Sequence, residues 1–225
     1  MGRISEQDVL WTHARLADLS TRAPHNPNAL LRLALIAIGL LACLQTGALG
    51  SGLLPPERVA LLLFKVIPYN QVWDGAEALR FEVVATGRAD LDRATAIADY
   101  LEAYSEQAQK KGATTPRLTA SVVLLDELES LTQRPEPPAA LLLIGGRDVP
   151  TPSPFEELAR AAVLRSILIV SDTEERLMDS SSLAFVHSTK SNRPEMVLRL
   201  ERSKAQGARF TASFIRLVRL WEEPR

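Results

Sequence analysis

Residues 140–172 read ALLLIGGRDVPTPSPFEELARAAVLRSILIVSD, and this stretch decides the fold class of the chain. An apolar run, Ala140–Ile144, is closed by two glycines, which is typical of a strand buried on both faces. A serine, a proline and a glutamate then form a capping box, so a helix is predicted from Pro154 to about Leu164. A second apolar run, Ile167–Val170, completes the unit. Strand, helix and strand in this order indicate two parallel strands joined by a crossover helix.

The same alternation of strands and helices extends toward the N-terminus. Leu79–Ala85 alternates apolar with more polar residues, which is the period of a strand. The cations and the glycine of Lys110-Lys111-Gly112 are typical of a helix end. The predicted elements upstream are a helix from Pro56 to Pro68, a strand over Leu79–Ala85, a helix from Leu91 to about Gln109, a strand over Leu118–Leu125 and a short helix over Asp126–Thr132.

The pattern changes downstream of Ser171-Asp172. Leu183–Ser188 and Glu195–Leu200 are extended runs separated by a polar segment, which predicts an antiparallel hairpin. The chain is then expected to close with a helix whose apolar face is formed by Phe214, Leu217, Val218 and Trp221. The predicted fold is therefore α/β, with a mostly parallel sheet, helices on both faces, an antiparallel hairpin at the C-terminal edge and a terminal helix.

An apolar segment near the N-terminus decides the compartment. Residues 29–50 carry one charge, Arg32, and their densely apolar part is about a dozen residues long, the length of a signal-peptide h-region rather than of a membrane span. Ala48 and Gly50 have the small-x-small spacing that signal peptidase accepts, so we expect a signal peptide cut near Gly50. Residues 53–225 then form one exported α/β domain. Residues 1–28 show no sustained period and are interpreted as disordered or as a start placed too far upstream.

Other interpretations of this segment stay open. Leu40-Leu41-Ala42-Cys43 resembles a lipobox, and a cut before Cys43 would leave the protein anchored to a membrane by lipid on that sulfur. An uncleaved anchor and a buried helix are further alternatives. An apolar cysteine is also a small hydrophobic residue that packs without any modification.

Composition excludes several classes of function. With 26 basic and 27 acidic residues, the net charge of −1 offers no electrostatic footprint for nucleic acid or for an anionic membrane surface. The single cysteine, Cys43, lies in the predicted signal peptide, so we expect neither a disulfide nor a cysteine metal site in the mature protein. His13, His25 and His187 are far apart in the sequence, which argues against a histidine metal site. No cofactor is predicted.

No catalytic motif appears in the sequence. A nucleophile elbow, a phosphate-binding loop, a dinucleotide fingerprint and a zinc-protease helix are all missing. Only His187 follows the predicted cut, so a hydrolase would depend on that histidine alone. Asp126, Glu127 and Glu129 crowd a predicted helix start, where the helix dipole explains the carboxylates. We therefore expect a protein that is not an enzyme.

One set of residues has the chemistry of a small-anion site. In open α/β sheets ligands bind beyond the carboxyl ends of the parallel strands, and two glycines beside two arginines occur there. Glycines that turn the chain and arginines that face water explain the same pattern. The candidates for ligand binding are Gly87, Arg88, Gly145, Gly146, Arg147, Ser171 and Asp172.

Three aromatic residues follow the first predicted helix. Phe64, Tyr69 and Trp73 could form a face that binds a partner protein. Aromatic residues at the end of an apolar helix more often belong to the core, and we favour that interpretation.

The order of these elements resembles the YfiR family of exported bacterial proteins. The match is strongest at residues 193–200, RPEMVLRL, and 205–217, AQGARFTASFIRL, which are similar to the family's closing strand, glycine turn and last helix. Val59–Trp73 resembles the family's opening segment, which ends near a tryptophan. Three strands also match in order: Leu79–Gly87, Ala140–Gly146 and Ile167–Asp172. The resemblance covers about residues 57–221.

The resemblance implies a periplasmic, non-enzymatic regulator, often dimeric. Such a protein restrains a membrane-bound diguanylate cyclase or another sensor by binding its extracytoplasmic part. Some members hold their fold with paired cysteines, which this chain lacks, so redox control is not implied. Leu200-Glu201 also stands where many relatives have an asparagine. The resemblance assigns no partner-binding residue, and a module that binds a small anion remains the main alternative function.

Overall fold

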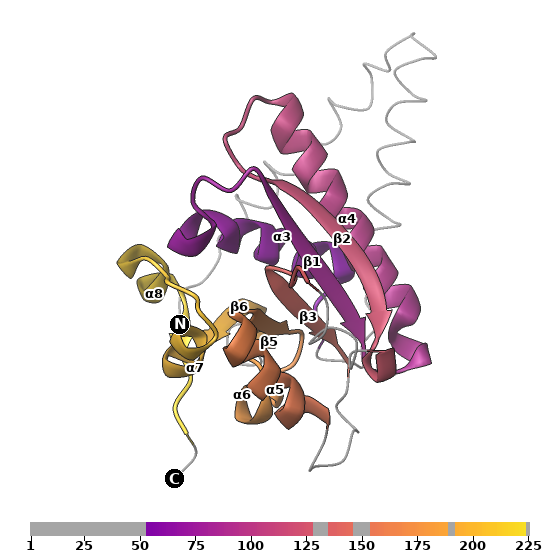
Figure 1. The fold of residues 1–225 in the computed structure, drawn as a ribbon, viewed down its shortest axis with the longest axis vertical. Coiled ribbons are helices and arrows are strands. Elements are labelled where there is room, and N and C mark those ends of the chain that lie inside the picture. The colour runs from indigo at the N-terminus through magenta and orange to yellow at the C-terminus, as the bar shows by residue number, and fades with distance from the viewer. Residues whose placement is uncertain (1–52, 128–134, 146–153, 189–191, 224–225) are drawn as a thin grey trace, which may run out of the picture. The chain divides into compact units, whose positions relative to one another are not determined.

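The computed structural model describes residues 53–127, 135–145, 154–188 and 192–223 (Figure 1). The predicted signal peptide, with Arg32, Ala48, Gly50 and Cys43, lies outside these residues, as does the segment 1–28. Among the described helices, none is both long enough and apolar enough to cross a membrane.

The described strands form one mixed sheet of the predicted α/β class. Their order is β2-β1-β3-β4-β5-β6-β7. The first five are parallel, β5 and β6 form the predicted antiparallel hairpin, and β6 and β7 are parallel. The strands are β1 Ala78–Ala85, β2 Arg117–Leu124, β3 Ala140–Ile144, β4 Leu168–Ser171, β5 Leu183–Ser188, β6 Arg193–Leu198 and β7 Arg219–Leu220.

Helices cover both faces of the sheet, as the alternating pattern predicted. On one face, α3 (Pro56–Val66) and α4 (Leu91–Lys110) bury Leu63 and Leu101 against strand residues such as Val83. Figure 1 shows α4 running alongside β1 and β2. On the other face, α5 (Pro154–Arg165) buries Phe155 against a second cluster of strand residues. Neighbouring strand residues point to opposite faces, so both clusters share the same strands.

The first helix ends where the sequence placed its end. α3 stops at Val66, and two short 3₁₀ turns follow, η1 (Ile67–Tyr69) and η2 (Gln71–Trp73). Pro68 has no backbone N–H to continue the helical ladder, which explains the change. The buried Asn70 then starts η2, because its side chain accepts a hydrogen bond from the backbone of Val72.

The prediction of a terminal helix that reaches Trp221 is wrong. Helix α8 spans only Ala212–Leu217, and β7 pairs with β6 immediately afterwards. The backbone N–H of Trp221 donates to the carbonyl of Leu198 at 2.9 Å. Without β7, the outer edge of β6 would leave backbone N–H and C=O groups unpaired. Only an extended chain can pair with them, so the chain leaves the helix after Leu217. As a result Leu217 is 62% exposed rather than facing the core.

Two short helices were not predicted. α6 (Arg176–Asp179) precedes β5, and α7 (Leu200–Ala205) takes over after β6 ends at Leu198, two residues before the predicted strand end. Helices of four to six residues leave too few turns for an apolar period to stand out. Most of the helix predicted over Asp126–Thr132, including Glu129, lies outside the described residues.

Candidate functional site

The carboxyl ends of β1, β3 and β4 meet at one edge of the sheet. The chain runs from β1 outward to β2 and then crosses to the other side of β1 to form β3, so the direction of winding reverses between β1 and β3. Ligands bind at such switch points in open α/β sheets. The structure brings Gly87, Arg88, Gly145, Ser171 and Asp172 to this edge, while Gly146 and Arg147 lie outside the described residues.

A buried ion pair occupies part of this edge. The Arg93 Nε donates to Asp172 Oδ2 at 3.0 Å, and the Gly145 N–H donates to Asp172 Oδ1 at 3.0 Å. The Asp172 side chain is fully buried. Burial raises the pKa of the Asp172 carboxyl above its ordinary value, although the Gly145 N–H and the Arg93 guanidinium act in the opposite direction. The N–H of Gly145 is therefore already used by the protein itself.

A second carboxylate lies at the same edge. Asp90 accepts a hydrogen bond from Thr86 Oγ1 at 3.0 Å, and a Cβ at Gly145 would overlap this carboxylate. The Ser171 hydroxyl donates to the carbonyl of Thr173 at 2.6 Å. The two carboxylates repel an anion, and the Gly145 N–H and the Ser171 hydroxyl already donate to groups of the protein, so this edge attracts an anion only weakly. Of the described candidates, the exposed Arg88 is the cation left to hold one.

A different hollow is lined by residues from both ends and from the middle of the domain. It has a volume of about 490 Å³, and we call it the apolar groove. Its walls come from the end of α3, the η1 turn, the segment just before β2, strand β6 and helix α8. The residues that line it are Phe64, Lys65, Pro68, Tyr69, Thr115, Met196 and Leu217. Most are apolar; the polar groups among them are one cation, Lys65, and two hydroxyls, those of Tyr69 and Thr115.

Aromatic packing makes one wall of the apolar groove rigid. Tyr69 stacks on Phe214 of α8 with ring centroids 5.4 Å apart, and Phe210 packs on the same ring at 4.6 Å. Phe214 is fully buried. Rings in such contact hold one another in place.

Hydrogen bonds, one from a side chain and one between backbone groups, hold the same two segments together. Asn70 Oδ1 accepts from the backbone N–H of Arg209 at 3.0 Å. The N–H of Thr211 donates to the carbonyl of Tyr69 at 3.0 Å. The two ends of the domain thus form one preformed surface.

The aromatic residues singled out in the sequence divide between core and groove. Trp73 is 7% exposed and packs edge-on against Phe81, so it belongs to the core, as favoured from the sequence. Phe64 and Tyr69 are half-buried and line the apolar groove. Sequence reasoning missed Lys65, Met196 and Leu217 as members of a site, because they come from segments far apart in the chain.

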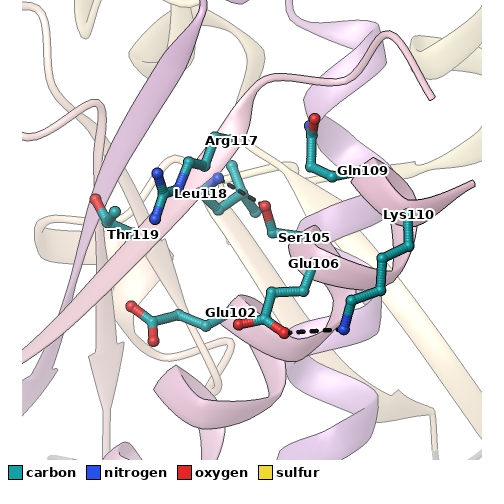
Figure 2. Close-up of a pocket in the computed structure, with 8 residues that line it drawn as sticks. All are labelled: Glu102, Ser105, Glu106, Gln109, Lys110, Arg117, Leu118 and Thr119. Carbon is teal, nitrogen blue, oxygen red and sulfur yellow. Dashed lines mark hydrogen bonds and ion pairs between the residues drawn. The ribbon is translucent and has the colours of Figure 1, made fainter. Parts of the chain in front are cut away.

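A polar pocket of about 370 Å³ lies beside the edge strand β2 (Figure 2). In Figure 2 the Ser105 side chain points toward Leu118, and its Oγ accepts from the Leu118 N–H at 2.8 Å. Glu102 accepts from the N–H of Ala120 at 3.1 Å. Both contacts satisfy outward-facing groups of the edge strand, which otherwise attract other chains. This pocket is therefore explained by the fold.

The next feature is the distribution of possible metal ligands and of His187. In the described ranges, no three His, Cys, Asp or Glu side chains lie close enough together to hold a metal ion. His187 is half-buried on β5, in register with Pro194 of β6.

Comparisons with known proteins found similarity of structure but no match in sequence. No protein-family model and no curated protein matches the chain. The chain is similar to the solved ABC domain of Streptococcus pneumoniae in complex with L-Trp, with 11% identity and a TM-score of 0.49 over 74% of this chain and 60% of that one. It is also similar to a conserved domain protein of Vibrio cholerae, with 13% identity, a TM-score of 0.46 and the same coverage. The chain spans 60% of the length of each of these two structures.

Proposed function

We propose that this chain is a non-enzymatic α/β binding protein that acts through the apolar groove. The observation that carries the proposal is the groove itself, where Leu217 is 62% exposed beside partly exposed aromatic rings. Exposed apolar surface of this kind is typical of a binding site. In its full form, the proposal is an exported periplasmic regulator of the YfiR type. It docks on the extracytoplasmic part of a membrane-bound diguanylate cyclase or sensor kinase.

The positions of the groove residues in the chain support the proposal of a YfiR-type regulator. Besides Thr115, the groove is lined by residues of the opening segment Val59–Trp73, by Met196 and by Leu217. Met196 and Leu217 belong to residues 193–200 and 205–217, where the resemblance to the YfiR family is strongest. A preformed surface binds with less ordering cost than a flexible one. The proposal includes a homodimer, which is common in that family. A lipid anchor at Cys43 is the alternative to release of the protein into the periplasm.

The test replaces one exposed leucine in the groove and one outside it. Leu217→Asp places a charge among the groove side chains, whereas Leu164→Asp changes a leucine of α5 that is 84% exposed and does not line the groove. We expect Leu217→Asp to raise cellular cyclic-di-GMP to the level of a deletion strain, with Leu164→Asp remaining at the wild-type level. Unchanged cyclic-di-GMP in the deletion strain would refute the regulator. Equal effects of the two variants would refute the groove as its docking surface.

A second candidate is a module for a small ligand at the switch point between β1 and β3. The topology favours it, and so does Thr173, which is 2% exposed and whose hydroxyl has no hydrogen-bond partner among the described residues. The carboxylates of Asp90 and Asp172 oppose an anionic ligand there. Thermal-shift measurements with phosphate, sulfate and amino acids decide this candidate. A shift that Thr173→Val removes supports it, and no shift at millimolar concentration refutes it.

A further inference from the structure

The apolar groove carries two polar groups whose chemistry points to a ligand. Thr115 lies just before β2, and its Oγ1 is shielded from water without a hydrogen-bond partner among the described residues. A buried hydroxyl without a partner is unfavourable, so native proteins rarely leave one. Because Thr115 lines the groove, rotation about its Cα–Cβ bond can turn the hydroxyl from its shielded position toward a ligand there.

Lys65 is the charged residue of the groove lining. Its side chain is exposed, and no carboxylate of the described residues lies within ion-pair distance of it. An ammonium group and a hydroxyl are both hydrogen-bond donors, and together they suit a carboxylate, which has two acceptor oxygens. The remaining lining offers aromatic and aliphatic surface to an apolar chain.

We infer that the apolar groove binds a medium-chain monocarboxylate, an aliphatic chain ending in a carboxylate group. The aliphatic chain lies against Phe64, Tyr69, Met196 and Leu217, and the carboxylate accepts hydrogen bonds from Lys65 and Thr115. The volume of about 490 Å³ lies within the range of about 300–1,000 Å³ typical of small-molecule sites. The inference goes beyond the proposed function, because such binding requires no protein partner.

The experiment titrates the purified protein with hexanoate, octanoate and decanoate, all below micelle-forming concentrations. Binding is measured by calorimetry and located by nuclear magnetic resonance shifts. Each buried methylene strengthens binding by up to about fourfold, so we expect affinity to rise by about threefold to tenfold for every two carbons added in an open groove. The neutral decanol is the comparator for the carboxylate. Decanoate is expected to bind more tightly than decanol at low salt.

Three variants assign the contacts. Thr115→Val keeps the shape of the side chain and removes the hydroxyl, so decanoate should bind about threefold to tenfold more weakly while the melting temperature stays equal or rises. A purely structural role for the hydroxyl would lower the melting temperature instead. Lys65→Met should reduce decanoate binding about twofold to fivefold and leave decanol unchanged. Lys110→Met, outside the groove, is the matched control. Leu217→Asp should abolish binding of both ligands.

Several outcomes overturn the inference. It fails if decanoate does not bind at millimolar concentration, if the shifts map away from the groove, or if decanol binds as tightly as decanoate. It also fails if Lys65→Met and Lys110→Met weaken decanoate binding equally. Failure here is distinguishable from failure of the regulator. A groove that controls cyclic-di-GMP through Leu217 but ignores decanoate supports the proposed function and refutes this inference.

Discussion

Replacing Arg93 with methionine should destabilise the protein, because it leaves the buried carboxyl of Asp172 without its cation. Arg93 neutralises the fully buried Asp172 and also donates from Nη2 to the carbonyl of Leu54 at 2.7 Å. Removing one partner of a buried ion pair costs about 3–5 kcal/mol, because the other charge is left buried alone. The Arg93 side chain is 19% exposed, so water reaches the gap and reduces the loss. We expect the free energy of unfolding to fall by about 2–3 kcal/mol at pH 7.

Asp172→Asn is the informative partner variant. Burial raises the pKa of Asp172, which means that this site disfavours the ionised carboxyl despite Arg93. The asparagine oxygen can still accept from the Gly145 N–H, and the remaining Arg93 reaches water. We therefore expect Asp172→Asn to cost less than about 1 kcal/mol. The double variant should recover most of the stability that Arg93→Met loses.

The pH dependence of Arg93→Met follows from the same carboxyl. Without Arg93, the pKa of Asp172 in the folded protein rises further above its unfolded value. Between these two pKa values the folded state binds more protons, so stability falls as pH rises. The difference in unfolding free energy between Arg93→Met and wild type should therefore shrink as pH falls from 7 toward about 4. Urea unfolding followed by circular dichroism at several pH values measures it. Equal losses for both single variants, or a difference that ignores pH, would refute the reasoning.

Three further predictions concern buried polar contacts and backbone geometry, each measured as a change in urea midpoint. Gln206→Ala should lower the free energy of unfolding by about 2–4 kcal/mol. The reason is that this buried amide accepts from the Ile169 N–H at 2.9 Å and donates to the Ser180 carbonyl at 2.9 Å. A loss of only about 0.5 kcal/mol, as is usual for an exposed residue, would contradict this prediction. Gly207→Ala should cost about 2–3 kcal/mol, because φ is +83° and the new Cβ would lie 2.7 Å from the Cβ of Ser166. Gly75→Ala, with positive φ and open space, is the control and should cost about 1 kcal/mol. Ser105→Ala should cost about 1–2 kcal/mol by leaving the buried Leu118 N–H without its acceptor, and an unchanged midpoint would contradict this.

Local patterns predicted the elements that depend on local physics. The capped helix at Pro154, the long helix that starts at Leu91 and the buried strand Ala140–Ile144 all appear within a residue or two of their expected bounds. Their signals are caps, spacing and burial, which neighbouring residues in the chain carry by themselves. The prediction that the terminal helix reaches Trp221 was wrong because it depended on a contact between distant parts of the chain. Whether the chain after Leu217 coils or extends depends on the free edge of β6, a contact that local spacing does not contain.

The candidate sites show the same division. From the sequence it was possible to expect that Gly87, Gly145 and Asp172 gather at one edge, because parallel strands share their carboxyl ends. It was not possible to see that Arg93 and Asp90 already engage that edge, since α4 and η3 (Arg88–Asp90) place them there only after the fold has formed.

By itself, the sequence determined the α/β class, the parallel βαβ units and the antiparallel hairpin, because period and capping are local properties. Only the tertiary structure decided the order of the strands, the exposure of Leu217 and the existence of the apolar groove. The groove joins Lys65, Thr115 and Leu217, which come from opposite ends and the middle of the domain. Surfaces of this kind arise from packing between distant segments, and no local pattern in the chain specifies them.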